Sequence, residues 1–394
     1  MMDFLEDQLE SLKKAGLYRS LRSLESPQSA ITIINGRKVV QLSSNNYLGL
    51  AYHPRLNAAA QEAIEKYGTG AGASRLICGN LELNTVLEHS LARLKKKEDA
   101  LLFSTGYMAN CGVLSALVGE GDVIFSDEFN HASIIDGCRM SRAEVKVYPH
   151  KDMSALEKLL KESQHHPHRL IVTDGIFSMD GDIAPLPHVV PLAQKYGCMV
   201  MVDDAHATGV LGEQGGGTGE YFDLEDEIDI SMGTLGKALG GFGAFVAGSR
   251  QLKEFLINRA RSFIFTTALP PAVIASGIAA LELLEEEPEI RMKLWENVAF
   301  FRKGIKTLGF TTGESETQII PLIVGDPALT MQMGELLFEE GVFVQGIRPP
   351  AVPRGSSRLR ITLMATHTQG QLEFALRALE KVGKKLHLMK DSRG

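Results

Sequence analysis

Short apolar runs alternate with longer amphipathic segments through the middle of the chain. Between residues 55 and 270, several runs have the length and apolar character of strands. They lie at residues 100–103, 122–125, 145–148, 170–173, 199–202, 228–231 and 243–247. Continuous apolar runs are typical of strands that are buried on both faces. The alternation therefore predicts an α/β domain with a mostly parallel central sheet and helices on both faces.

Different patterns come before and after this region. Apolar residues spaced like one face of a helix predict an amphipathic helix over residues 4–24. Residues 31–40 predict a hairpin, because apolar residues flank an Asn35-Gly36 turn. Residues 271–286 predict a further helix after the last run of the alternating region. Amphipathic elements thus flank the predicted sheet on both sides.

The last hundred residues mix helical patterns with shorter strands. Two apolar runs, at residues 318–324 and 358–363, predict strands within this part. The mixture is typical of a smaller α+β domain that covers a larger one. We therefore expect three parts of the chain: an N-terminal helix and hairpin over residues 1–45, a large α/β domain over 46–285 and a small C-terminal α+β domain over 286–394.

Composition narrows the class of protein. The 394 residues are 44% hydrophobic and 23% charged, which is ordinary for a globular protein. A net charge of −7 argues against a general affinity for nucleic acid or anionic membranes. The four cysteines are scattered singly, as expected for reduced thiols. The acidic start at residues 3–7 resembles no signal peptide and no long apolar stretch follows, so we expect a cytoplasmic protein.

One lysine lies among small residues. Lys237 ends the sequence Gly-Thr-Leu-Gly-Lys at 233–237 and is followed by Ala-Leu-Gly-Gly. A lysine that forms an imine must be reachable and partly neutral. A glycine-lined pocket with groups that lower the pKa suits that requirement better than an open surface does. Lys237 is therefore a candidate for Schiff-base chemistry.

A carboxylate and a histidine precede this lysine by about thirty residues. Asp203 falls at the carboxyl end of the predicted strand 199–202, where ligands bind in open α/β sheets. Pyridoxal phosphate draws electrons from an amino acid only while its pyridine nitrogen is protonated, and a buried carboxylate keeps the proton there. Asp203 and Lys237, with His206 nearby, therefore suggest an enzyme that uses pyridoxal phosphate.

Other interpretations fit these and neighbouring segments less well. Residues 203–206 include competent metal ligands, but successive strand residues point to opposite faces, so we expect no metal site. Residues 68–73 match a loose dinucleotide-binding fingerprint but follow a predicted helix instead of a strand. Residues 233–237 are too short for a P-loop and lack its Ser or Thr. The glycines within 215–219 predict a mobile surface turn.

Further segments would complete a cofactor pocket. Gly106 and Tyr107 open a predicted helix after a strand, so their backbone amides can bind a phosphate. His131 lies just beyond another strand, where an imidazole could lie flat on a pyridine ring. Residues 174–182 follow a third strand end, and Arg360 could bind a substrate carboxylate through two parallel hydrogen bonds.

These motifs together resemble the α-oxoamine synthase family, over nearly the whole chain. Members are pyridoxal phosphate enzymes of fold type I that condense an amino acid with an acyl thioester. Six ordered segments carry the resemblance, which makes it far more specific than any single motif. They are residues 44–50, 130–133, 174–181, 202–206, 233–237 and 358–360.

The resemblance implies a role for each matching residue. Lys237 would hold the cofactor and, once displaced by substrate, act as the base. Asp203 would pair with the ring nitrogen and His206 with the phenolic oxygen, while His131 would stack on the ring and assist the acyl transfer. The other implied contacts are Gly106, Tyr107 and Thr234 for the phosphate, Thr266 or Thr267 from a second subunit, Ser178 beside the cofactor, and Asn45 and Arg360 for the amino-acid carboxylate.

Members of the family differ in the amino acid and the acyl group. Residues 347–363 are most similar to members that join L-alanine to a pimeloyl thioester, on CoA or a carrier protein, giving 8-amino-7-oxononanoate, CO2 and free thiol in biotin biosynthesis. Residues 75–79 and 134–137 are more similar to members that join glycine to acetyl-CoA, which is the alternative. Arg19 matches an arginine that meets the distal carboxylate of the acyl chain. Ala351 stands where a substrate-contacting threonine is expected.

The resemblance also implies a homodimer with its site at the interface. A second possibility is a catalytically silent subunit of a larger complex. The presence of Lys237, Asp203 and His206 argues against a silent subunit, because the residues that such a subunit would lose are intact.

Overall fold

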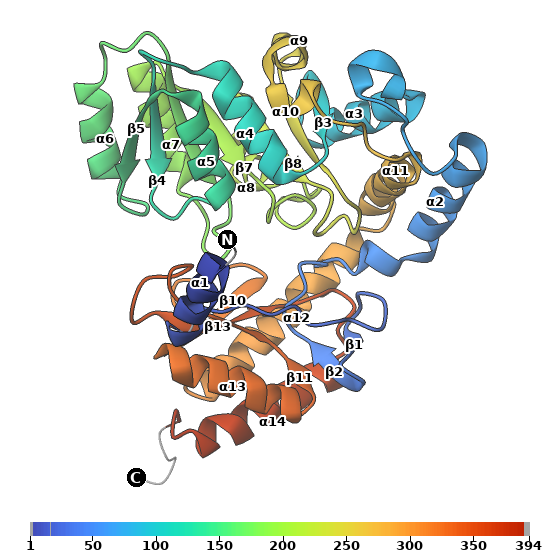
Figure 1. Ribbon diagram of the computed structural model, residues 1–394, viewed down its shortest axis with the longest axis vertical. Coiled ribbons are helices and arrows are strands. Elements are labelled where there is room, and N and C mark those ends of the chain that lie inside the picture. Colours follow the sequence, from blue (N-terminus) through green and yellow to red (C-terminus); the bar gives the residue numbers. More distant parts are fainter. Residues whose placement is uncertain (1–2, 16, 390–394) are drawn as a thin grey trace.

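A seven-stranded sheet forms the centre of the upper lobe in the computed structural model, which describes residues 3–15 and 17–389 (Figure 1). The strand order is β3-β9-β8-β7-β6-β4-β5, and only β9 runs antiparallel to its neighbours. The predicted mostly parallel sheet is therefore confirmed. The strands are β3 (Asp99–Phe103), β4 (Val123–Asp127), β5 (Glu144–Tyr148), β6 (Arg169–Asp174), β7 (Met199–Asp203), β8 (Ile230–Thr234) and β9 (Ala244–Gly248).

Side chains alternate between the two faces of this sheet. On β4, Ile124 points into one core while Val123 and Phe125 point into the other. The first core is closed by α4 (Gly106–Leu117) and α5 (Ala132–Ser141), and the second by α6 (Met153–Glu162) and α7 (Leu186–Tyr196). Helices thus cover both faces, as the continuous apolar runs predict.

The largest apolar core connects the two lobes. It begins where α3 (Glu82–Leu94) and α11 (Pro271–Glu286) cover the β3–β9 end of the sheet, and it continues into the lower lobe. Helix α2 (Pro54–Tyr67) packs along α11 at the edge of the molecule (Figure 1). From there α12 (Pro288–Thr307) runs down into the lower lobe. The helix predicted at 271–286 is confirmed.

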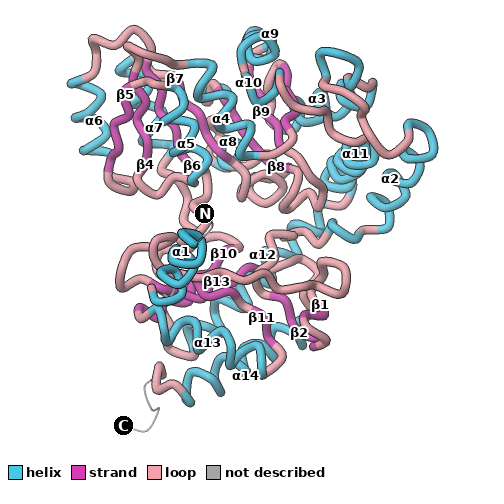
Figure 2. Tube along the Cα trace, viewed as in Figure 1, coloured by secondary structure: helices cyan, strands magenta, loops and turns pink. Residues whose placement is uncertain are grey.

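The lower lobe is built around two small sheets (Figure 2). One is antiparallel, with the order β10-β13-β12, and contains both strands predicted for the last hundred residues. Helices α13 and α14 close its core. The bounds are β10 (Ile319–Gly325), α13 (Pro327–Glu339), β12 (Gln345–Ile347), β13 (Ser357–Thr362) and α14 (Gln369–Lys385).

The second small sheet joins the N-terminal hairpin to a strand of the C-terminal part. Strands β1 (Ile31–Ile34) and β2 (Arg37–Gln41) form the predicted hairpin, and β11 (Val342–Phe343) pairs with β2 in parallel. The N-terminal hairpin therefore lies beside the C-terminal part. The division of the chain at residues 45 and 285 stays a prediction.

The predicted N-terminal helix is too long. Helix α1 is Asp3–Lys14, and residues 17–23 have no regular structure. The Leu17 amide bonds back to the Leu12 carbonyl at 2.8 Å, a wide turn that ends helices. Leu21 is fully exposed, so continuing the helix would have buried nothing there.

Shorter elements complete the chain. No described helix combines the length and the apolar character needed to span a bilayer. The remaining elements are α8 (Thr218–Tyr221), α9 (Arg250–Arg259), α10 (Arg261–Ile264), the 3-10 turns at Leu50–Tyr52 and Glu225–Glu227, and a π-helical turn at Arg75–Gly79.

We expect Phe301→Ala to destabilise the fold strongly. Phe301 is fully buried on α12, in the core that both lobes share. Its truncation should lower the free energy of unfolding by about 3–5 kcal/mol, because apolar burial is lost and a cavity remains. Phe374→Ala on α14, where the side chain is 41% exposed, is the control and should cost below about 1 kcal/mol. Denaturant unfolding measures both, and equal midpoints would contradict the shared core.

Candidate active site

The sequence-predicted site residues gather at one edge of the large sheet. Strands β4, β6, β7 and β8 are parallel, and β3 runs in the same direction because β9 is antiparallel to both β3 and β8. All five therefore end at the same edge, where α/β sheets bind ligands. The residues that follow these strand ends are Gly106 and Tyr107, His131, Ser178, His206, and Lys237, with Asp203 closing β7.

The amine of Lys237 lies beside an imidazole instead of a carboxylate. Its Nζ is 3.1 Å from Nε2 of His206. Desolvation is the main cause that lowers the pKa of Lys237, to about 8, and the Arg360 charge adds to it. The charges of Asp203 and Asp174 oppose this shift without cancelling it. A substantial fraction of the amine is therefore neutral near physiological pH.

A hydrogen-bond chain orients the imidazole. Burial, with the charge of Lys237, lowers the pKa of His206 well below its ordinary value, so the ring is neutral and has one N–H. Its Nδ1 is 2.6 Å from the hydroxyl of Tyr47, which donates to Oδ1 of Asn45 at 3.1 Å. One consistent direction runs from Lys237 through His206 and Tyr47 to Asn45. Tyr47 therefore fixes which nitrogen of the ring faces the lysine.

Two buried carboxyl groups lie side by side on neighbouring strands. Asp203 accepts hydrogen bonds from the Asn110 side chain at 2.8 Å and from the Ala205 amide at 2.9 Å. Asp174 is its register partner across β6 and β7. Burial, together with the charge of Asp203, raises the pKa of Asp174 well above its usual range. Asp174 is therefore the carboxyl group of the pair whose neutral form is favoured.

His131 is connected to both carboxyl groups. Its backbone amide donates to Oδ2 of Asp174 at 2.7 Å. Its Nδ1 is 2.7 Å from the Ser133 hydroxyl, which accepts from Asn110 at 2.8 Å, and Asn110 also donates to Asp203. The ring itself is exposed at the edge of the site. Its position is thus set by the groups that surround Asp203, while its face remains free for a planar ligand.

The start of α4 forms the anion-binding side. The first amides of a helix are not used within it, and α4 begins at Gly106. A Cβ at Gly106 would come within 3.0 Å of Thr234, so the two residues border one narrow space. The Tyr107 hydroxyl is bound to Asp136 at 2.5 Å, which leaves the Tyr107 amide as the group that can face a phosphate. The three predicted phosphate residues therefore lie together.

Arg360 joins the lower lobe to this site. It lies on β13 and donates from Nε to the Ser178 carbonyl at 2.5 Å and from Nη1 to Asn45 at 3.1 Å. Its Nη2 makes no hydrogen bond to any described residue. Ser178, Asn45 and Arg360 are thus together, with one guanidinium nitrogen left to bind a carboxylate.

Four predicted residues make no hydrogen bond to the site residues described so far. The carbonyl of Thr267 accepts a hydrogen bond from Ser104 at 3.4 Å, so the segment with Thr266 and Thr267 lies beside the end of β3. Arg19 and Ala351 are both exposed. Their roles stay predictions.

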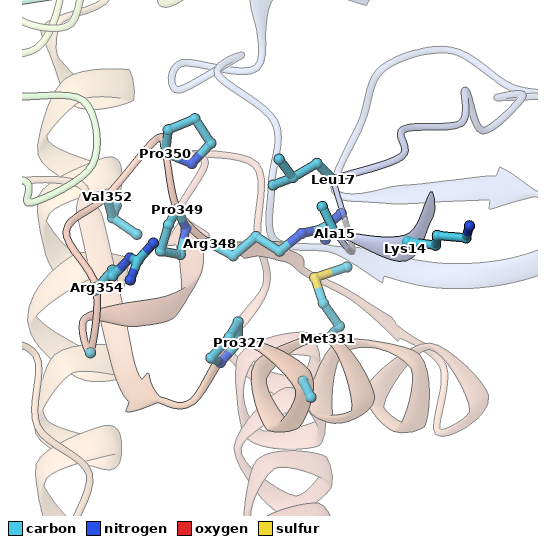
Figure 3. Close-up of a pocket in the computed structure, with 12 residues that line it drawn as sticks. Lys14, Ala15, Leu17, Pro327, Met331, Arg348, Pro349, Pro350, Val352 and Arg354 are labelled. Atoms are coloured by element: carbon cyan, nitrogen blue, oxygen red, sulfur yellow. The ribbon is translucent and has the colours of Figure 1, made fainter. Parts of the chain in front are cut away.

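A large cavity lies between the segments that carry Arg19 and Ala351. It has a volume of about 1120 Å³ and is bounded by the end of α1, the start of α13 and the loop 348–355 (Figure 3). Arg348 spans it and donates to the Tyr18 carbonyl at 3.3 Å. Its lining is mostly apolar, as Leu17, Met331 and Val352 illustrate. None of the predicted cofactor residues lines it.

The glycine-rich segment 215–219 is buried, so the predicted mobile surface turn is wrong. Asp204 is the reason: it accepts from Lys95 at 2.9 Å and from the Thr218 hydroxyl at 2.6 Å, and all three are buried. A Cβ at Gly217 would meet Asp204 at 2.2 Å. Glycine is needed here to let the backbone approach a buried ion pair.

Sequence reasoning missed the residues that hold the catalytic groups in place. Tyr47, Asn110, Ser133 and Asp174 all bond to site residues, although Tyr47, Ser133 and Asp174 lie inside segments that carry the family resemblance. Asn110 is a buried residue of α4, and no motif around it in the sequence indicates a role in the site. The packing of α4 on β8 and β9 brings it to Asp203 at the end of neighbouring β7.

The assembled groups fit pyridoxal phosphate. A carboxylate, a lysine amine with a lowered pKa and a helix start with free amides lie around one space. These are the three chemical groups that a protonated pyridine nitrogen, an aldehyde and a phosphate require.

Comparison with known proteins agrees with this chemistry. The family model described as aminotransferase class I and II matches residues 37–379. The 8-amino-7-oxononanoate synthase of Geobacter sulfurreducens is 56% identical over 97% of this chain and 98% of its own length. That of Thermoanaerobacter pseudethanolicus is 53% identical, with 98% of each chain covered.

Solved structures share the fold over nearly the whole chain. Serine palmitoyltransferase from Sphingomonas wittichii has a TM-score of 0.94 at 34% identity and covers 99% of this chain and 98% of its own. The enzyme of the same name from S. paucimobilis, solved with a bound PLP–myriocin aldimine, has a TM-score of 0.93 at 34% identity, with 98% of both chains covered. The fold is thus that of fold type I enzymes, and the cofactor is pyridoxal phosphate.

Covalent attachment of pyridoxal phosphate should report the lowered pKa of Lys237. Only the neutral amine attacks an aldehyde, so the attachment rate of cofactor-free protein should rise with pH and level off above about 8. Asp203→Asn should move this midpoint to lower pH, because Asp203 raises the pKa of Lys237. Stopped-flow absorbance measures the rate, with exposed Lys38→Gln as the control. A midpoint near 10 would contradict the assignment.

Proposed function

This chain belongs to the class I and II aminotransferase family, and from that premise we propose that it condenses L-alanine with a pimeloyl thioester. The products are 8-amino-7-oxononanoate, CO2 and the free thiol, and the reaction serves biotin biosynthesis. The observation that carries the proposal is identity of 50–56% with relatives named 8-amino-7-oxononanoate synthase, over nearly the whole chain. Those names favour this reaction over the condensation of glycine with acetyl-CoA.

The residues of the site can carry out the proton transfers of this reaction. Bound pyridoxal phosphate supplies an electron sink that weakens the Cα–H and Cα–carboxylate bonds of the amino acid. Nζ of Lys237, which is partly neutral, accepts the Cα proton, and Nε2 of His206 keeps that amine oriented. Asp203 is the residue that would hold a protonated ring nitrogen.

Substrate orientation falls to the groups around Arg360. Its free Nη2 can bind the carboxylate of alanine, while its bonds to Ser178 and Asn45 fix the guanidinium plane. His131, exposed at the edge of the site, can polarise the thioester carbonyl. These roles stay proposals for each residue.

The large cavity supports a long acyl chain better than an acetyl group. The loop 348–355, which lines the cavity, leads directly into β13. Arg360 lies three residues after Ser357, the first residue of this strand, so the cavity loop and Arg360 are separated by about 10 Å along the strand. A pimeloyl chain is apolar with an anionic end, which suits an apolar cavity with Arg348 and Arg19 near it. We propose that Arg19 binds the distal carboxylate and that the Ala351 loop lies against the chain.

The active form is proposed to be a homodimer in the cytoplasm. The Thr267 carbonyl accepts a hydrogen bond from Ser104, two residues before Gly106, so Thr266 and Thr267 border the phosphate side, where we expect a second subunit to approach. Exposed apolar side chains near them, Phe265, Leu76 and Ile77, provide surface for such an interface.

A crossed substrate assay tests the function. Thiol release with alanine and pimeloyl-CoA should exceed release with the other pairings of alanine or glycine with pimeloyl-CoA or acetyl-CoA. Lys237→Ala should abolish turnover and the visible absorbance of the bound cofactor, because both depend on its amine. Preference for glycine with acetyl-CoA would support the alternative, and an active Lys237→Ala variant would overturn the proposed role of this residue.

Arg19→Gln tests the acyl end of the site. If Arg19 binds the distal carboxylate, the variant should raise the KM for pimeloyl-CoA about tenfold or more, the loss expected when a charged hydrogen bond of 1.5–3 kcal/mol is removed. The KM for alanine should not change. Lys38→Gln removes an exposed positive charge from the hairpin and is the control. Steady-state kinetics with both substrates would reject the role if the KM for pimeloyl-CoA stayed constant.

A further inference from the structure

His150 lies outside the site, between two loops that carry site residues. It follows β5, in the turn before α6. Its Nδ1 is 2.9 Å from Oδ1 of Asp127 at the end of β4, and its Nε2 is 2.9 Å from Oδ2 of Asp182 in the loop after β6. Both carboxylates are at most 3% exposed, and His150 is 17% exposed. Nothing in the proposed chemistry so far uses this cluster.

The geometry favours a protonated ring. A neutral imidazole has one N–H and can donate to only one carboxylate, whereas both nitrogens of His150 are within hydrogen-bond distance of a carboxylate oxygen. The imidazolium donates to both. Burial lowers the pKa of His150, but the hydrogen bonds and charges of Asp127 and Asp182 outweigh it and raise that pKa to about 9.

Three more charged residues, Glu128, Lys151 and Glu314, lie around the cluster of His150, Asp127 and Asp182. The His150 amide donates to Glu128 at 2.8 Å. Lys151 donates from its amide to Asp127 at 2.9 Å and from Nζ to Asp182 at 2.8 Å, and its Nζ is 3.8 Å from the exposed Glu314. Oδ1 of Asp182 has no partner among the described residues. Within the described part of the chain, the side chains that bind the Asp182 carboxylate are thus His150 and Lys151.

On one side, the cluster reaches His131. Oδ1 of Asp127 also accepts from the amide of Phe129 at 2.9 Å. The ring of Phe129 stacks on that of His150, with centroids 4.5 Å apart and planes inclined by 22°. His131 is two residues further along the chain, so His150 fixes the backbone that leads into it.

On the other side, the cluster reaches Ser178 and Arg360. The ring of Phe177 meets that of His150 edge-on at 4.4 Å, and its amide donates to the Asp182 carbonyl at 3.1 Å. Ser178 comes next, and its carbonyl holds Nε of Arg360. Asp182 therefore has two contacts: its carbonyl closes the loop that carries Ser178, and its carboxylate binds His150.

We propose that His150 is a positioning residue whose imidazolium ties the His131 loop to the Ser178 loop through Asp127 and Asp182. It touches neither substrate nor cofactor. The inference rests on the proposed function, because it assigns His150 to the geometry of that site. The stabilising contact is complete below the ordinary histidine pKa of about 6.5 and is lost as pH rises through about 9.

The test is the pH profile of kcat with alanine and pimeloyl-CoA. Wild-type enzyme should lose activity on an alkaline limb near pH 9. His150→Gln can donate to only one carboxylate, so we expect a roughly tenfold or greater drop in kcat at pH 7, as small misplacements of reacting groups cause, and no limb near pH 9. His168→Gln is the matched control. It breaks a histidine–Asp122 contact of 2.9 Å at the opposite end of the same strands, and should keep the wild-type profile.

Asp182→Asn provides a second, milder variant. It removes one of the two charges that raise the pKa of His150, so the alkaline limb should move to lower pH. Wild-type profiles in both His150→Gln and Asp182→Asn would overturn the proposal. An inactive wild-type enzyme on these substrates, with activity on another pair, would instead contradict the proposed function, and the same profiles would then be measured on that pair.

Discussion

The arrangement of the site depends on a buried lysine amine that has no carboxylate partner among the described residues. Lys237 contacts neutral His206, so its ammonium form loses water without gaining an ion pair. Had Asp203 bonded Nζ directly, the amine would have stayed charged and unreactive. The structure instead keeps Asp203 engaged by Asn110 and Ala205. This arrangement keeps the Asp203 carboxylate away from the Lys237 amine. Tyr47 and Asn45 contribute to it by orienting His206, and Arg360 contributes through its hydrogen bond to Asn45.

The neighbouring carboxyl groups of Asp174 and Asp203 are a second place where charge is kept apart in the site. Two buried like charges on adjacent strands repel each other, and the raised pKa of Asp174 relieves that repulsion. Asp174 then serves as an acceptor for the His131 amide, while Asp203, which accepts from Asn110 and Ala205, is the residue proposed to pair with a cofactor nitrogen. A similar division appears in the surrounding loops, where Asp127 and Asp182 act on backbone and histidine instead of on substrate. Carboxyl groups of the same type thus have different tasks because their hydrogen-bond partners differ.

The sequence predicts what depends on local pattern. The strand runs, the helix at 271–286, the hairpin and the place of Asp203 at a strand end follow from periodicity and turn chemistry. The family motifs bring Lys237, His131 and Arg360 into one hypothesis. The burial of Gly217 and the contacts of Asn110 do not follow, because they depend on Lys95 and Asp203, which lie far away in the chain. The end of α1 does not follow either, because helical spacing does not show whether the fold offers a surface to the predicted apolar face. Leu21 has a helical spacing, for example, but the fold provides no surface for it.

The small sheet of β1, β2 and β11 has a consequence for how the protein is made. Val40 pairs with Val342, so about 300 residues must leave the ribosome before the first hairpin meets its third strand. At about 5–20 residues per second, this delay is of the order of 15–60 s. The seven-stranded sheet needs nothing beyond β9 and can form in that interval. During synthesis from the N-terminus, the hairpin of β1 and β2 therefore has no third strand until all seven strands of the large sheet have been made.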